Sequence, residues 1–138
     1  MGVDAADLNN DGWSDIVTLD MQPETSERKK LMFSFLTYER YELERRAGFE
    51  PEFMYNMLQL NNGVRDVAGR PEPYFSEIGR MAGLSATDWS WSVLLADFDN
   101  DGWKDVHITN GMGRDLIHAD FIQYRGGRVP LWPTYLTL

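Results

Sequence analysis

The alternation of apolar and polar residues along the chain predicts a series of short β-strands. In six segments, apolar residues alternate with polar ones or run on without a break, as in strands with one or both faces buried. These segments are residues 2–6, 16–19, 57–60, 74–78, 90–96 and 106–109. The third is expected to end at a turn formed by Asn61, Asn62 and Gly63. The chain is therefore expected to be mainly β.

The pattern changes between about residues 23 and 55, which predicts a helical insertion. Pro23 followed by Glu24 is typical of a helix start with proline in the first helical position. Apolar residues then recur near the helical period, at Leu31, Phe35, Tyr38, Tyr41 and Leu43. The dense charge of this segment indicates a solvated helix face, and a partner-binding insertion is the alternative. A further short helix is expected over 115–124.

One acidic segment occurs twice, which indicates an internal repeat. Residues 6–15 recur as residues 96–105, and each copy joins two of the predicted strands. Two more predicted strands lie between the copies, so the repeating unit has four strands, the size of a β-propeller blade. The predicted fold class is a mainly β fragment of a β-propeller, one blade plus half of the next, with a helical insertion.

The repeat sets the predicted domain boundaries. Residues 2–79 form a blade with the loop 7–15 and the insertion at about 23–55, and residues 80–125 begin the next blade with the loop 97–105. Residues 126–138 have no clear period and are predicted as an irregular tail. Because a propeller closes with four or more blades, further blades are expected from the same polypeptide or from other protein chains.

Both loops have the spacing Asp-x-Asn/Asp-x-Asp-Gly-x-x-Asp, which predicts calcium binding. Calcium takes six to eight oxygen ligands at about 2.3–2.6 Å, and a short loop that coils around the ion supplies them. Side chains at positions one, three, five and nine and the carbonyl at position seven are the expected ligands, and glycine at position six permits the sharp turn. Two structural Ca²⁺ ions are predicted, bound by Asp7, Asn9, Asp11, Trp13 and Asp15, and by Asp97, Asp99, Asp101, Trp103 and Asp105.

The two predicted sites are not equivalent. Asp99 stands where the first loop has Asn9, so the second loop carries one more carboxylate and is expected to bind calcium more tightly. An acidic turn without metal is the alternative, but clustered carboxylates repel one another without a cation. Magnesium is disfavoured because it prefers a small octahedral shell rich in water.

Other calcium folds fit the sequence poorly. An EF-hand needs a glutamate at position twelve of the loop, where this chain has Thr18 and Ile108. Dockerin-like repeats place a helix after each loop, whereas strands are predicted here. Thrombospondin-type calcium repeats need cysteines, and the chain has none. A strand-loop-strand setting remains.

Composition excludes some classes of function. The net charge is −9 and the isoelectric point about 4.6, so nucleic acid and anionic membranes are repelled. The absence of cysteine excludes disulfides and thiolate metal sites. The longest apolar run is far too short to span a bilayer, so no transmembrane segment is expected.

The two loops resemble the calcium loops of FG-GAP/VCBS repeats, the integrin-α type of β-propeller. The tract between Asn56 and Asp105 is similar to a narrower group, the VCBS-repeat proteins of Bacteroidota and the cartilage acidic protein 1 (ASPIC/UnbV) family. The resemblance covers most of residues 1–125 and implies a secreted or surface-exposed propeller. It does not imply an enzyme, because the family has no shared catalytic constellation. Residues 63–73 depart from it, since they form a longer connection than the usual turn.

No catalytic or cofactor-binding residue is predicted. His107 and His118 have no second histidine or cysteine at ligand spacing, so both are interpreted as structural or surface residues. The acids Glu50, Glu52 and Glu77 would suit a glycosidase pair only if two of them lay close together, which sequence spacing does not establish.

The predicted function is that of a calcium-stabilised, non-enzymatic binding or adhesion module of a secreted or cell-surface propeller protein. The alternative is an accessory propeller domain or subunit of an enzyme, or of an outer-membrane uptake or secretion complex. Trp89 and Trp91 are expected to pack between blades, and a glycan-stacking platform is the sharper alternative. The expected location is extracellular or at the cell surface, associated with the outer membrane of a Gram-negative bacterium.

Overall fold

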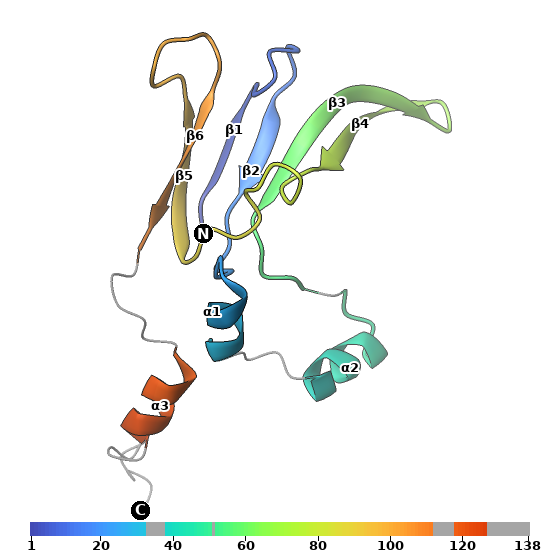
Figure 1. Ribbon diagram of the computed structural model, residues 1–138. Helices are drawn as coiled ribbons and strands as arrows, with labels where there is room; N and C mark the ends of the chain where they lie inside the picture. Colours follow the sequence, from blue (N-terminus) through green and yellow to red (C-terminus); the bar gives the residue numbers. More distant parts are fainter. Residues whose placement is uncertain (33–37, 51, 112–117, 127–138) are drawn as a thin grey trace, which may run out of the picture. The chain divides into compact units, whose positions relative to one another are not determined.

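A computed structural model of the chain describes residues 1–32, 38–50, 52–111 and 118–126 (Figure 1). The chain divides into two compact units, each built from two separate stretches of sequence. The sheet unit is Met1–Glu24 with Phe53–Met112, and the helical unit is Thr25–Glu52 with Gly113–Leu138. Both acidic loops lie in the sheet unit. The predicted boundary between residues 79 and 80 falls inside this unit and stays a prediction about the repeat.

The sheet unit contains six strands in two antiparallel sheets (Figure 1). The first sheet has the order β1-β2-β3-β4, with β1 at Val3–Ala6, β2 at Asp15–Thr18, β3 at Met57–Val67 and β4 at Arg70–Glu77. The second sheet pairs β5, Ser90–Ala96, with β6, Asp105–Asn110. Each of the six predicted strand segments coincides with one of these strands, which confirms the prediction of a mainly β chain.

The connection between β3 and β4 corrects one prediction. We expected a turn at Asn61, Asn62 and Gly63, but β3 continues past them to Val67, with a bulge between Asn61 and Val64. The turn lies at Ala68 and Gly69, whose positive φ angles of 54° and 79° suit a two-residue hairpin loop. The prediction failed because a glycine with positive φ, here Gly63, occurs in β-bulges as well as in hairpin turns.

The core of the sheet unit lies between the two sheets. Val17 and Leu58 of the first sheet, Leu19 directly after β2, and Val93 and Leu95 of the second sheet form one buried cluster. Val17 is paired with Leu58 across β2 and β3, so the two side chains leave the sheet on the same face. The buried apolar faces therefore hold the two sheets together.

Strands β1 and β5 approach each other unusually closely within this unit. The backbone N–H of Leu95 donates a hydrogen bond of 2.9 Å to Oδ2 of Asp4. A Cβ atom at Gly2 would lie 2.8 Å from the carbonyl oxygen of Trp91, so only glycine fits there. The β5–β6 hairpin is thus attached to the first sheet by polar contacts as well as by the core.

Asn56, which precedes β3, is a buried polar residue that links three segments of the sheet unit. It is 1% exposed, and its Oδ1 accepts a 2.7 Å hydrogen bond from the backbone N–H of Asp20. Its Nδ2 donates to the carbonyl of Leu84 at 2.8 Å and to Oγ1 of Thr87 at 2.6 Å. Its own N–H donates to the carbonyl of Ser85. The side chain therefore holds the segment between β4 and β5 against the end of β2.

Replacement of Asn56 is expected to destabilise the sheet unit. In Asn56→Ala, the N–H of Asp20 and the acceptors of Leu84 and Thr87 lose a buried partner, so the free energy of unfolding should fall by about 3 kcal/mol. Urea denaturation followed by tryptophan fluorescence measures this. Asn56→Asp is the matched comparison: it keeps the acceptor for Asp20 but places a carboxylate oxygen against the carbonyl of Leu84, so it should be destabilised as well. Equal stability of Asn56→Ala and the wild type would contradict the assignment.

The helical unit contains α1 at Ser26–Leu31, α2 at Tyr38–Arg46 and α3 at Ala119–Gly126. The prediction that the first helix starts at Pro23 is wrong, because Thr25 is the N-cap and its Oγ1 accepts from the N–H of Arg28 at 3.2 Å. Of the predicted helix at 115–124, residues 115–117 lie outside the described residues, and α3 covers the remainder from Ala119 and continues to Gly126. Residues 33–37 and 51 of the predicted insertion and residues 127–138 of the predicted tail lie outside the described residues.

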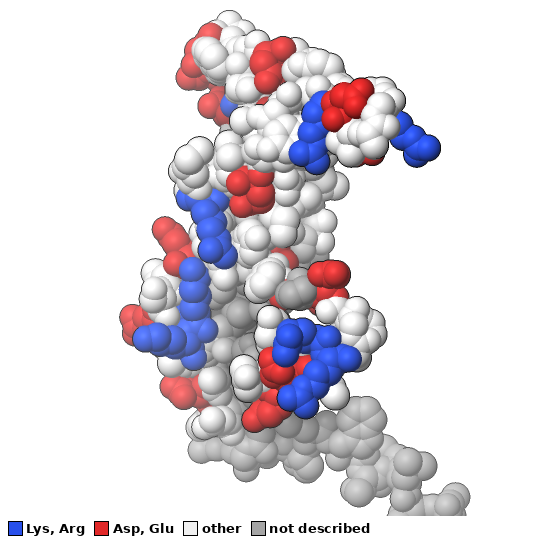
Figure 2. All heavy atoms as spheres, turned by 90° about the vertical axis from the view of Figure 1, so that its right-hand side faces the viewer, with Lys and Arg blue, Asp and Glu red and all other residues white. Residues whose placement is uncertain are grey.

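The surface of α2 supports the interpretation of a solvated helix face. Arg40 is hydrogen-bonded to Glu44 at 2.7 Å, and this bond raises the pKa of the Arg40 guanidinium above its ordinary value. Glu42 likewise pairs with Arg45 at 3.3 Å and with Arg46 at 3.6 Å. Figure 2 shows one face of the molecule on which basic and acidic side chains lie interspersed.

Among the described residues, no helix has the length and apolar character needed to cross a membrane.

Candidate metal centre

The two acidic loops adopt the same turn conformation. The first loop, residues 7–15, joins β1 to β2, and the second loop, residues 97–105, joins β5 to β6. Asn10 and Gly12 have φ angles of 58° and 88°, and Asn100 and Gly102 have 62° and 92°. Asparagine and glycine tolerate this left-handed conformation better than other residues. The repeated sequence therefore folds into a repeated local structure.

The first aspartate of each loop organises the turn. Asp7 accepts hydrogen bonds from the N–H groups of Asp11 and Gly12 at 3.1 and 2.8 Å. Asp97 accepts the equivalent bonds from Asp101 and Gly102 at 3.0 and 2.9 Å. These bonds coil the loop backbone around the carboxylate.

The last aspartate of each loop closes the turn from the other side. Oδ2 of Asp15 accepts from the N–H of Leu8 at 2.9 Å, and Oδ2 of Asp105 accepts from the N–H of Phe98 at 3.0 Å. Since positions one and nine are both tied to the loop backbone, their carboxylates lie on either side of the same turn.

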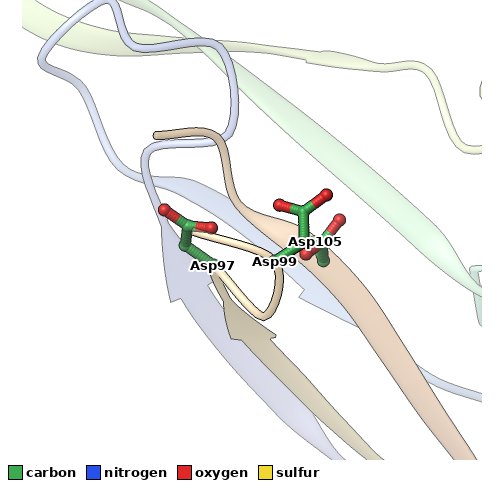
Figure 3. Close-up of side chains that lie close together, drawn as sticks. All are labelled: Asp97, Asp99 and Asp105. Atoms are coloured by element: carbon green, nitrogen blue, oxygen red, sulfur yellow. The ribbon is translucent and has the colours of Figure 1, made fainter. Parts of the chain in front are cut away.

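In the second loop, three of the predicted ligands come together (Figure 3). One carboxylate oxygen from each of Asp97, Asp99 and Asp105 lies within 4.8 Å of the others. Oxygens on opposite sides of a calcium ion are separated by about twice the calcium–oxygen distance, roughly 4.6–5.2 Å. The group is therefore suited to a divalent cation held by hard oxygen ligands, and calcium stays the prediction for it.

The carboxylate at the fifth position of each loop accepts a hydrogen bond from the loop backbone, and its role as a calcium ligand stays a prediction. Asp101 does not belong to the group of three, and its Oδ1 accepts from the N–H of Trp103 at 2.8 Å. Asp11 makes the same bond to Trp13, also at 2.8 Å. In the described structure these two carboxylates support the turn.

The first loop lacks a carboxylate at position three, because Asn9 occupies the position of Asp99. Nδ2 of Asn9 donates to Oδ2 of Asp11 at 2.9 Å. Among the described residues, the carboxylates of Asp7, Asp11 and Asp15 do not form a group like that of the second loop. The expected ligand set at this site is thus poorer in charge, and the difference in calcium affinity between the two loops stays a prediction.

The closing aspartates differ most in their surroundings. Asp15 is 0% exposed, because β3 covers it and the N–H of Asn61 donates to its Oδ1 at 2.8 Å. Asp105, at the start of β6, is exposed. Asn61 is a residue that sequence reasoning missed as part of this site, since its Asn-Gly context was interpreted as a turn.

The two loops also touch each other. Nδ2 of Asn10 donates to the carbonyl oxygen of Gly102 at 3.1 Å.

The tryptophans at position seven, Trp13 and Trp103, are 47% and 53% exposed. Only their backbone carbonyls are predicted as ligands, so exposure of the rings does not conflict with that role.

The two histidines and the three candidate acids are not members of the acidic group of the second loop. The ring of His107 packs edge-on against that of Phe98, with 5.8 Å between the ring centroids. Nδ1 of His118 accepts a hydrogen bond of 3.3 Å from the N–H of Asp120. Oε1 of Glu77 in the sheet unit accepts from the N–H of Gly79 at 2.7 Å. Glu50 and Glu52 belong to the helical unit, where with three other residues they line a hollow of about 380 Å³.

The two tryptophans near β5 have different environments. A Cβ atom at Gly111 would lie 2.1 Å from the ring of Trp91, so the ring packs on the glycine backbone, with 52% of the residue exposed. Nε1 of Trp89 is buried and has no hydrogen-bond partner among the described residues. Sugar stacking stays a prediction for this pair.

No protein-family model, no curated protein and no solved structure matches this chain. The resemblance to FG-GAP/VCBS repeats therefore rests on the loop motif and on the tract between the loops.

Proposed function

We propose that the chain is a calcium-stabilised, non-enzymatic binding or adhesion module, built as one β-propeller blade and half of the next, of a secreted or cell-surface protein. The observation that carries the proposal is the repeated loop geometry. Two copies of one acidic motif, each between antiparallel strands, form the same hydrogen bonds from positions one, five and nine.

The arrangement of the strands supports the propeller part of the proposal. The first sheet has four antiparallel strands in sequential order, as a blade does, and the second has two. Buried residues of both sheets, among them Leu58 and Val93, form one apolar cluster, as expected for neighbouring blades that bury their faces against each other. Further blades come from the same polypeptide or from partner chains.

The proposed role of calcium is structural. The second loop brings three carboxylates within 4.8 Å of one another, and a divalent cation offsets their repulsion. An ion bound only by the folded loop shifts the folding equilibrium by mass action. Calcium at millimolar concentration is found outside the cytoplasm, which is the location proposed for the protein.

Isothermal titration calorimetry on the full chain tests the proposal. Two calcium ions should bind, the tighter one in the second loop. Asp99→Asn gives the second loop the ligand set of the first, so its calcium dissociation constant should rise about tenfold. Asn9→Asp makes the reciprocal change and should tighten the weaker site.

Glu72→Gln is the control for loss of a carboxylate, because Glu72 lies on β4 outside both loops. Its calcium binding should equal that of the wild type. Absence of binding heat at millimolar calcium, confirmed by equilibrium dialysis, would refute the proposal. An equal loss in Glu72→Gln and Asp99→Asn would show that calcium responds to net charge only.

A further inference from the structure

The outer edge of β6 differs from the corresponding edge of β2. In the first sheet, β2 is paired with β1 on one side and with β3 on the other. In the second sheet, β6 is paired with β5, and no other described strand pairs with it. A free strand edge presents unpaired N–H and C=O groups and is a template for another strand.

In the first sheet, β3 does more than continue the ladder. The N–H of Asn61 donates to Oδ1 of Asp15 at 2.8 Å, and its Nδ2 donates to the carbonyl of Ser14 at 3.1 Å. The carboxamide is held in this orientation because its Oδ1 accepts from the N–H of Gly63 at 2.9 Å. One Asn-x-Gly sequence thus satisfies both acceptors at the start of β2 and buries Asp15.

Gly63, two residues after Asn61, contacts the ring of Trp13 in the first loop. A Cβ atom at Gly63 would lie 3.5 Å from the ring of Trp13, so the ring lies over this glycine. Leu58, in the same strand, contributes to the core. The strand that fits this edge therefore has a recognisable pattern: apolar, any residue, apolar, Asn, any residue, Gly.

The second sheet offers the same acceptors without a donor. Oδ2 of Asp105 accepts from Phe98, as Oδ2 of Asp15 accepts from Leu8. Among the described residues, however, no N–H donates to Oδ1 of Asp105 or to the carbonyl of Lys104. Asp105 is exposed where its counterpart is fully buried.

We propose that the free edge of β6 is a docking site for an extended peptide segment of another polypeptide with the pattern of β3. The segment adds to β6 as an antiparallel strand. Its asparagine donates through N–H to Oδ1 of Asp105 and through Nδ2 to the carbonyl of Lys104, and its glycine lies under Trp103. The interface repeats the β2–β3 contact already present in the molecule, and strand addition supplies affinity through main-chain hydrogen bonds.

This inference rests on the proposed blade architecture but not on the bound ions. Strand addition is therefore expected in EDTA as well as in calcium, whereas calcium binding is measured without the peptide. A chain that binds the peptide but no calcium would refute only the metal part of the proposed function.

The test uses the full chain and a synthetic, fluorescently labelled peptide with the sequence of residues 56–67. Fluorescence anisotropy should show saturable binding of one peptide per chain. Hydrogen exchange should show protection of the amides of β6, Asp105–Asn110, on the side facing away from β5. Replacement of the peptide asparagine that corresponds to Asn61 by proline removes the donated N–H and should weaken binding about tenfold or more.

Two further controls keep the result decisive. The peptide with Asn62→Ala should bind like the unmodified peptide, because Asn62 bonds Leu60 and Ser76 of its own hairpin instead of β2. In the protein, Asp105→Ala should weaken binding of the unmodified peptide.

Four results would each overturn the proposal. The first three are no saturable binding, equal affinity of the proline and unmodified peptides, and protection of β6 amides in the chain without peptide. Protection of β2 in place of β6 would show exchange with the chain's own β3, and it would also overturn the assignment to β6.

Discussion

Millimolar calcium is expected to raise the melting temperature of the chain by about 15 °C above its value in EDTA. Each ion present at a hundredfold excess over its dissociation constant adds about 2.7 kcal/mol to the free energy of unfolding, so two sites add about 5 kcal/mol. The physical reason is that the unfolded chain does not hold Asp97, Asp99 and Asp105 within 4.8 Å of one another. Differential scanning calorimetry in calcium and in EDTA measures the shift.

Magnesium is the matched ionic control for this experiment. It has the same charge but prefers six ligands at about 2.0–2.1 Å and retains its water, so its effect at equal concentration should be much smaller. Equal shifts with both ions would indicate screening of the net charge of −9 in place of specific binding. The double variant Asp7→Asn with Asp97→Asn should lose most of the calcium shift. Indifference of the wild type to EDTA would exclude a structural role for the ion.

The second large effect is expected from Asp15→Ala, which should lower the free energy of unfolding by about 4 kcal/mol even in EDTA. Asp15 is fully buried, and its two oxygens accept from the N–H groups of Leu8 and Asn61. Both donors lose their partner in the variant, and the side chain leaves a cavity where β3 crosses the loop.

Asp105→Ala is the matched control, since Asp105 has the same place in the repeat. In EDTA it should cost only about 1 kcal/mol, because Asp105 is exposed and accepts one described bond, from Phe98. Denaturant titration of both variants, with and without calcium, separates the structural loss from the loss of metal. Equal destabilisation of the two variants in EDTA would contradict the difference in burial on which this prediction rests.

The strands were predictable because their pattern is local. Alternation along β5 and the acidic repeat indicate strands without any knowledge of the partner strand. The bulge at Gly63 was not predictable in this way, because the same Asn-Gly signal suits a hairpin turn and a bulge. The choice depended on Asn61, whose N–H and carboxamide bond Asp15 and Ser14 from 46 and 47 residues away in sequence.

The start of the first helix illustrates the same limit on a smaller scale. Proline and threonine both mark helix starts, and Pro23 and Thr25 stand two residues apart. The hydrogen bond from Arg28 to Thr25 decided between them.

The sequence by itself determined the mainly β fold and the conformation of the two loops. Asn, Gly and Asp at fixed spacing encode a turn through bonds between near neighbours, such as Asp7 with Gly12. Only the tertiary structure decided that Asp15 is buried and Asp105 exposed, although the sequence around them is nearly the same. The physical reason is that burial of a carboxylate depends on a donor from a distant strand, and β3 supplies it to Asp15.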